Sequence, residues 1–112
     1  MTGPDPKRLE RLAQIAALIR DQAQAELARH ARACAQTRQH LASLEAAPAA
    51  DSDLPPQVLE HVALQHCRWA APQKARLNTT LAAQTALKLQ AETAARAAFG
   101  RAQVLDKLAK GR

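Results

Sequence analysis

The sequence predicts an all-α protein: a single antiparallel two-helix coiled-coil hairpin over residues 1–112, with the second helix kinked near Pro72. Two observations predict it. Apolar and small residues recur in alternating steps of three and four along two long stretches, which is the spacing of a coiled-coil seam. The composition agrees, because 47% of the residues are hydrophobic but many of these are Ala, the strongest helix former, and only 2% are aromatic.

The first helix is expected over about residues 6–47. Asp5 can accept hydrogen bonds from the first free amides, and Pro6 suits the first helical turn. No Gly or Pro follows until Pro48. One extra step of four in the seam is a stutter, which locally relaxes a left-handed supercoil. The seam residues expected on this helix are Leu9, Leu12, Ala16, Ile19, Ala23, Leu27, His30, Cys34, Thr37, Leu41 and Leu44.

A turn is expected over residues 48–55, because the stretch "PAADSDLPP" combines three prolines with small capping residues. The second helix is then expected over about residues 56–110, with a kink or break near Pro72, which lacks an amide donor. Residues 57–71 allow two arrangements: a separate helix at the tip, with Leu44 facing the region of Leu77, or the start of a kinked second helix, with Leu44 facing the region of Val58. The denser turn signals at 48–56 favour the kinked helix.

A second heptad follows Pro72, and its length of roughly 38 residues, similar to that of the first helix, predicts that the two helices pair as a hairpin. Polar residues such as Thr37 and Gln84 interrupt both predicted seams, which weakens an interface but fixes its register. The seam residues expected on the second helix are Leu77, Thr80, Gln84, Leu87, Ala91, Ala94, Ala98, Arg101, Leu105 and Leu108.

Phe99 and Leu81 fall outside this predicted seam, on one outward line of the second helix. Either a different register buries Phe99, or the side chain is an exposed apolar contact for a partner. Gly100 beside it costs about 1 kcal/mol relative to Ala inside a helix, which indicates a close approach of another group or a local weak point.

The charge favours an acidic partner. Sixteen Lys and Arg against ten Asp and Glu give a net charge of +6, and residues 73–112 carry all of this excess. A basic coiled coil that binds nucleic acid is therefore one alternative, although the bases are scattered around the helix and aromatic side chains for stacking are almost absent. A self-associating structural protein that forms a four-helix homodimer is another. No apolar run is long enough for membrane insertion.

The sequence contains no signature of an enzyme, a metal site or a cofactor site. It has no Gly-rich phosphate loop, no paired carboxylates in an apolar setting and no zinc-ligand spacing among its four His and two Cys. We therefore expect a protein without catalytic activity, cofactor or metal. Cys34 and Cys67 form no CxxC pair and the N-terminal stretch has no apolar signal segment, so a cytoplasmic location is expected.

The two heptad stretches, "RLERLAQIAALIRDQAQAELARHARACAQTRQHLASLE" and "LNTTLAAQTALKLQAETAARAAFGRAQVLDKLAKGR", together resemble the FliJ and YscO group. These are the stalk proteins of flagellar and virulence type III export ATPases. The resemblance implies a rod seated in a hexameric ATPase ring, with further contacts to the export gate or to export chaperones. It also implies partner-binding candidates: Phe99 and Leu81 as anchors, flanked by Arg96, Arg101 and Lys107.

Overall fold

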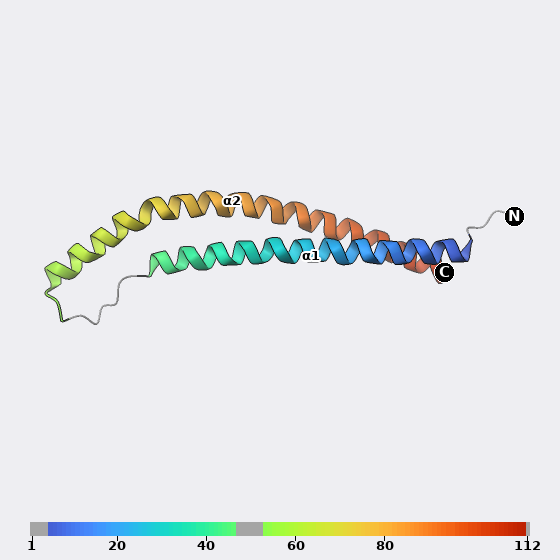
Figure 1. Cartoon of the computed structure of the whole chain (residues 1–112), viewed down its shortest axis with the longest axis horizontal. Coiled ribbons are helices and arrows are strands. Elements are labelled where there is room, and N and C mark those ends of the chain that lie inside the picture. The colour runs from blue at the N-terminus through green and yellow to red at the C-terminus, as the bar shows by residue number, and fades with distance from the viewer. Residues whose placement is uncertain (1–4, 47–52, 112) are drawn as a thin grey trace. The chain divides into compact units, whose positions relative to one another are not determined.

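The computed structural model describes residues 5–46 and 53–111, and within them the chain forms an all-α helical hairpin. Helix α1 spans Pro6–Glu45 and helix α2 spans Pro56–Ala109 (Figure 1). The predicted fold is therefore confirmed. Of the predicted boundaries, residue 47 of the first helix and residues 48–52 of the turn lie outside the described residues. No helix in the described part of the chain is long and apolar enough to cross a membrane.

The helix ends follow from local chemistry. Asp5 caps α1 as expected, since its Oδ1 atom accepts a hydrogen bond from the Lys7 amide at 3.1 Å. Pro55 precedes α2, and its carbonyl oxygen accepts the amides of Val58 and Leu59. Helix α2 ends before Gly111, which has a φ of 75° and donates its amide to the Leu108 carbonyl at 3.1 Å. Gly tolerates this left-handed conformation, and so it terminates the helix at little cost.

The hairpin divides into two compact units. The terminal unit consists of residues 1–31 and 86–112, and the central unit consists of Arg32–Thr85. Both units pair a stretch of α1 with a stretch of α2, and both have a thin core of mainly small side chains. The buried residues are Ala16, Ala95, Ala98 and Ala102 in the terminal unit, and Cys34, Thr37, Leu44 and Ala70 in the central unit.

In the central unit, α2 continues without a break through Pro72, and Figure 1 shows α2 bending in this part of the helix. Residues 57–71 are thus the start of α2, as the kinked-helix alternative predicts. Leu44 was expected to face the region of Val58; its carbonyl instead lies 3.0 Å from Nε2 of His66, eight residues further along α2. The His66 ring in turn lies 5.7 Å from the ring of Trp69.

A polar pair crosses the helix interface of the central unit. The buried Thr37 hydroxyl lies 2.6 Å from Oε1 of Gln84 and 3.1 Å from the Ala33 carbonyl. The hydroxyl donates its proton to Oε1 of Gln84, the shorter of the two contacts, and so links α1 to α2. The predicted polar seam residues therefore contact each other directly.

The predicted seam of α1 is wrong at two positions. Ala13 and Arg20 are half-buried, whereas Leu12 and Ile19, expected in the seam, are 43% and 49% exposed. With Ala13 and Arg20 in place, the three-four alternation runs from Leu9 to Leu44 without a stutter.

The predicted seam of α2 is displaced by one residue at every second position. Leu77, Gln84, Ala91, Ala98 and Leu105 are buried or half-buried as expected. The positions in between are taken by Leu81, Lys88, Ala95, Ala102 and Ala109, and not by Thr80, Leu87, Ala94, Arg101 and Leu108. Ala94 and Leu87 therefore lie on the flank of the seam, while Ala95 and Lys88 lie within it.

Candidate interaction surfaces

Two opposite faces flank the seam of the terminal unit. Successive residues of an α-helix are rotated by about 100°, so Phe99 and Arg101 project about 200° apart from α2. Ala17 and Ile19 are separated in the same way on α1. Both faces are hollowed between the helices, and α1 and α2 contribute side chains to each hollow. The terminal unit therefore offers two distinct surfaces.

The first face carries a cluster of large apolar side chains, which we name the isoleucine patch. It comprises Leu12, Ile15 and Ile19 from α1 and Leu105 from α2, around a hollow that Ala16, Ala98 and Arg101 also line. Ile15 is 53% exposed, although Ile is among the residues most often buried in folded proteins. Leu108 at 49% and Val104 at 58% exposure add further apolar surface to the same stretch of α2.

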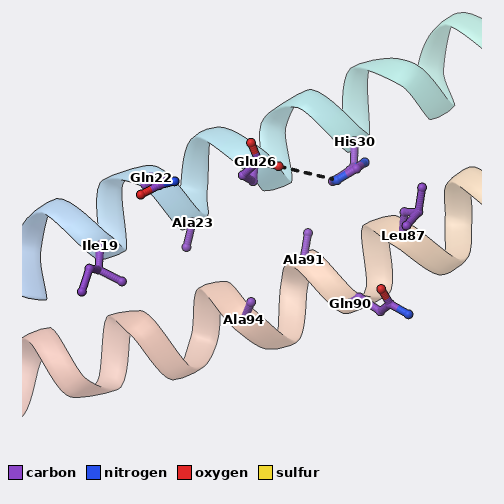
Figure 2. Close-up of a pocket in the computed structure, with 9 residues that line it drawn as sticks. All are labelled: Ile19, Gln22, Ala23, Glu26, His30, Leu87, Gln90, Ala91 and Ala94. Atoms are coloured by element: carbon purple, nitrogen blue, oxygen red, sulfur yellow. Dashed lines mark ion pairs between the residues drawn. The ribbon is translucent and has the colours of Figure 1, made fainter.

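The same face continues into a second hollow, which we name the alanine groove. Its floor consists of Ala23 from α1 and Ala91 and Ala94 from α2, which face one another across the gap between the helices (Figure 2). Ile19 lines both hollows, so the patch and the groove are contiguous. The remaining lining residues are Gln22, Glu26, His30, Leu87 and Gln90.

Glu26 gives the alanine groove its negative charge. Its Oε2 atom pairs with Arg29 one turn along α1 and lies 3.9 Å from Nε2 of His30. Figure 2 shows Glu26 and His30 at the α1 edge of the groove. The Glu26 side chain is 49% exposed, so its carboxylate remains accessible to a further cation.

The opposite face carries Phe99, which is 48% exposed. Phe99 lines one hollow with Arg96, Gly100 and Leu27, and a second with Ala17 and other small or polar residues. We name Phe99, Arg96 and the residues lining these two hollows the phenylalanine surface. Arg96 is 79% exposed and lies 3.9 Å from Glu92, so its guanidinium is available beside an apolar anchor.

No packing contact in this structure requires a Gly at position 100. A Cβ atom built on Gly100 meets nothing within 4 Å outside its own stretch of helix. The close approach that the sequence suggested is therefore absent, and Gly100 leaves open space next to Phe99.

The structure brings together only two of the five predicted partner-binding residues. Arg96 and Phe99 share the phenylalanine surface, whereas Arg101 lies at the isoleucine patch. Lys107 lines a separate polar hollow with Gln103, Asp106 and Lys110. Leu81 was expected to project outward on the line of Phe99, and this is wrong: it is half-buried at a seam position of the central unit.

The isoleucine patch was missed because the predicted seam absorbed Leu12 and Ile19. A signal for it is present in the sequence. If the alternation is continued backward from Leu27 without a stutter, it passes through Arg20 and Ala13 and leaves the large apolar residues Leu12, Ile15 and Ile19 outside. Size favoured the wrong register, because Leu and Ile bury more apolar area than Ala.

Within residues 5–46 and 53–111, no three His, Cys, Asp or Glu side chains gather closely enough to hold a metal ion. Both cysteines are free thiols, Cys34 buried and Cys67 exposed. No protein-family model, curated protein or solved structure matches this chain.

Proposed function

We propose that this chain is a non-enzymatic helical-hairpin interaction protein that docks another protein through the phenylalanine surface. One observation carries the proposal: the single Phe of the chain is 48% exposed, beside the 79% exposed guanidinium of Arg96. Aromatic and Arg side chains dominate the binding energy of protein interfaces when they enter a partner's pocket. An exposed pair of this kind supports a docking role.

The charge supports an acidic partner surface. The terminal unit has eleven Lys and Arg against six Asp and Glu, so it carries +5 of the net charge of +6. Complementary charge accelerates association and selects the partner. The phenylalanine surface belongs to this unit, so the apolar anchor and the steering charge lie on the same part of the chain.

As the specific partner we propose a hexameric export ATPase, with the chain acting as its stalk and contacting the export gate or export chaperones. The support is the resemblance of both heptad stretches to the FliJ and YscO group, together with the helical hairpin and the basic terminal unit. This function belongs in the cytoplasm, where free thiols such as those of Cys34 and Cys67 persist.

The test is capture of the purified export ATPase of the source organism by the full chain. Phe99→Ala and Arg96→Glu are each expected to weaken capture about tenfold or more, because both remove a central contact. Leu18→Ala is the control for Phe99→Ala, since Leu18 is 69% exposed and lies outside both faces. Arg11→Glu, at an exposed position on the outer side of α1, is the control for the charge reversal.

Each outcome decides the proposal. Loss of capture in the two test variants, with the controls and the helicity unchanged, supports it. Unchanged capture by Phe99→Ala and Arg96→Glu overturns the assigned surface, and no capture by the natural chain overturns the stalk role. Binding to generic duplex DNA that persists at physiological salt favours the nucleic-acid alternative, since non-specific phosphate contacts weaken steeply with salt.

A further inference from the structure

We propose that the isoleucine patch and the alanine groove form a self-complementary interface on which a second copy of this chain docks in antiparallel orientation. The resulting homodimer is a four-helix assembly at the terminal unit. This inference does not rest on the proposed function, because the phenylalanine surface lies on the opposite face.

The accessible surface of the chain is large enough for part of it to be buried in a dimer interface. Its accessible surface is 8619 Å², about 2,600 Å² more than the roughly 6,000 Å² expected for a compact monomer of 12.1 kDa. A specific interface buries about 1,600 Å² in total over both partners. Each copy would then contribute about 800 Å², which is well within this excess.

Exposed apolar side chains line the face on which such an interface would form. Leu12, Ile15, Ile19 and Leu87 are each between 43% and 53% exposed and all line the one continuous face. Monomeric proteins rarely expose contiguous apolar patches of this kind unless a partner covers them. The face therefore needs an occupant.

The two ends of this face have complementary shapes. The patch end, nearer the chain termini, presents the large side chains Leu12, Ile15 and Leu105. The groove end presents a floor of the alanines Ala91 and Ala94. Large side chains inserted over small ones are the packing mode of coiled coils and helix bundles. A two-fold axis beside Ile19, which borders both hollows, places the patch of each copy over the groove of the other.

The charges select the same orientation. Arg101 lines the patch end and pairs with no other described residue, whereas Glu26 lines the groove end. In the antiparallel dimer each Arg101 meets Glu26 of the other copy, so two ion pairs form. In the parallel alternative Arg101 meets Arg101 and Glu26 meets Glu26. The repulsion between these like charges makes the parallel arrangement less stable.

The first test is the mass of the full chain in solution. Sedimentation equilibrium over a dilution series is expected to show a reversible species of twice 12.1 kDa. Ile19→Gln is expected to raise the dimer dissociation constant about tenfold or more, since it places a polar amide at the centre of the interface. The matched control is Leu18→Gln, on the adjacent residue that projects away from this face.

The second test is a charge swap that also reads the orientation. Arg101→Glu and Glu26→Arg are each expected to raise the dissociation constant about tenfold, because each creates two like-charge contacts. The double variant with both changes in one chain is expected to restore the natural value, because every Glu again meets an Arg of the other copy. Both positions are exposed, so far-ultraviolet circular dichroism is expected to show unchanged helicity.

A mass of 12.1 kDa at every concentration would overturn the dimer. An equal effect of Ile19→Gln and Leu18→Gln would overturn the assigned face. A double swap that fails to restore the natural dissociation constant would overturn the antiparallel orientation, and unchanged binding in all three charge variants would indicate a parallel pairing, in which like charges meet whichever sign they carry. Phe99→Ala distinguishes the dimer from the proposed function, because this variant is expected to reduce capture of the partner protein while the mass of the dimer stays unchanged.

Discussion

Leu44→Ala is the sharpest test of how α1 packs on α2 in the central unit. Leu44 is the one large apolar side chain in residues 5–46 and 53–111 that is buried, with 6% of its surface exposed. Its backbone carbonyl also contacts His66 of α2, so the residue joins the last turn of α1 to the second helix. Truncating the side chain removes this apolar contact and leaves the backbone contact in place.

The expected loss in the free energy of unfolding is about 2–3 kcal/mol. Full burial of a Leu side chain contributes about 1.5–3 kcal/mol, and Leu→Ala in protein cores costs about 2–5 kcal/mol once the cavity is included. Leu44 lies one residue before the end of α1 at Glu45, where neighbours can relax into the space, so the lower part of that range applies. A hairpin of this size has about 5–15 kcal/mol in total, so the loss is a large fraction of its stability.

The assay is urea unfolding at one fixed protein concentration, followed by far-ultraviolet circular dichroism, because dimer formation would otherwise change the apparent stability. Leu18→Ala is the control: it has the same effect on helix propensity but is 69% exposed, and we expect it to change stability by less than about 0.5 kcal/mol. If Leu44→Ala and Leu18→Ala lower the free energy of unfolding by the same amount, Leu44 is not buried between α1 and α2 in the central unit.

Three further changes test other parts of the hairpin. Gly100→Ala should stabilise the chain by about 0.5–1 kcal/mol, because the new Cβ meets no neighbour and helical Gly is entropically costly; a destabilised variant in thermal unfolding would show that the space is not free. Replacing both members of the polar pair, by Thr37→Val with Gln84→Leu, should raise the free energy of unfolding by about 1–2 kcal/mol and allow alternative oligomers. Urea unfolding measures the stability and sedimentation measures the oligomeric state. A double variant less stable than the natural chain would contradict the prediction. Pro72→Ala should restore a helical amide donor and increase stability by about 1–2 kcal/mol, measured by urea unfolding. A less stable variant would contradict this prediction and would show that the bend in α2 is required for packing.

The helices and their ends could be predicted from sequence because their determinants are local. Asp5 and Pro6 define the start of α1, and Pro55 and Pro56 define the start of α2. Both predicted helices ended within one or two residues of the observed ends at Glu45 and Ala109. Capping and helix propensity act over a few neighbouring residues, so they need no knowledge of the partner helix.

The choice of seam residues could not be fixed in the same way, and the candidate surfaces depend on it. Coiled coils tolerate a stutter, so the spacing admitted both the seam through Leu12, which needs one, and the seam through Ala13, which does not. On α2 the same ambiguity separates Ala94 from Ala95, and it decides whether Arg101 is in the seam or on the surface.

By itself, then, the sequence determined that this chain is a hairpin of two long helices with an Ala-rich interface and a basic terminal portion. Only the tertiary structure decided which side of each helix is covered, and with it that Leu12, Ile15 and Ile19 form a surface while Leu81 belongs to the seam. The physical reason is that burial is shared between two helices. Which of two adjacent residues is covered depends on how the other helix lies against it, and this appears in neither helix alone.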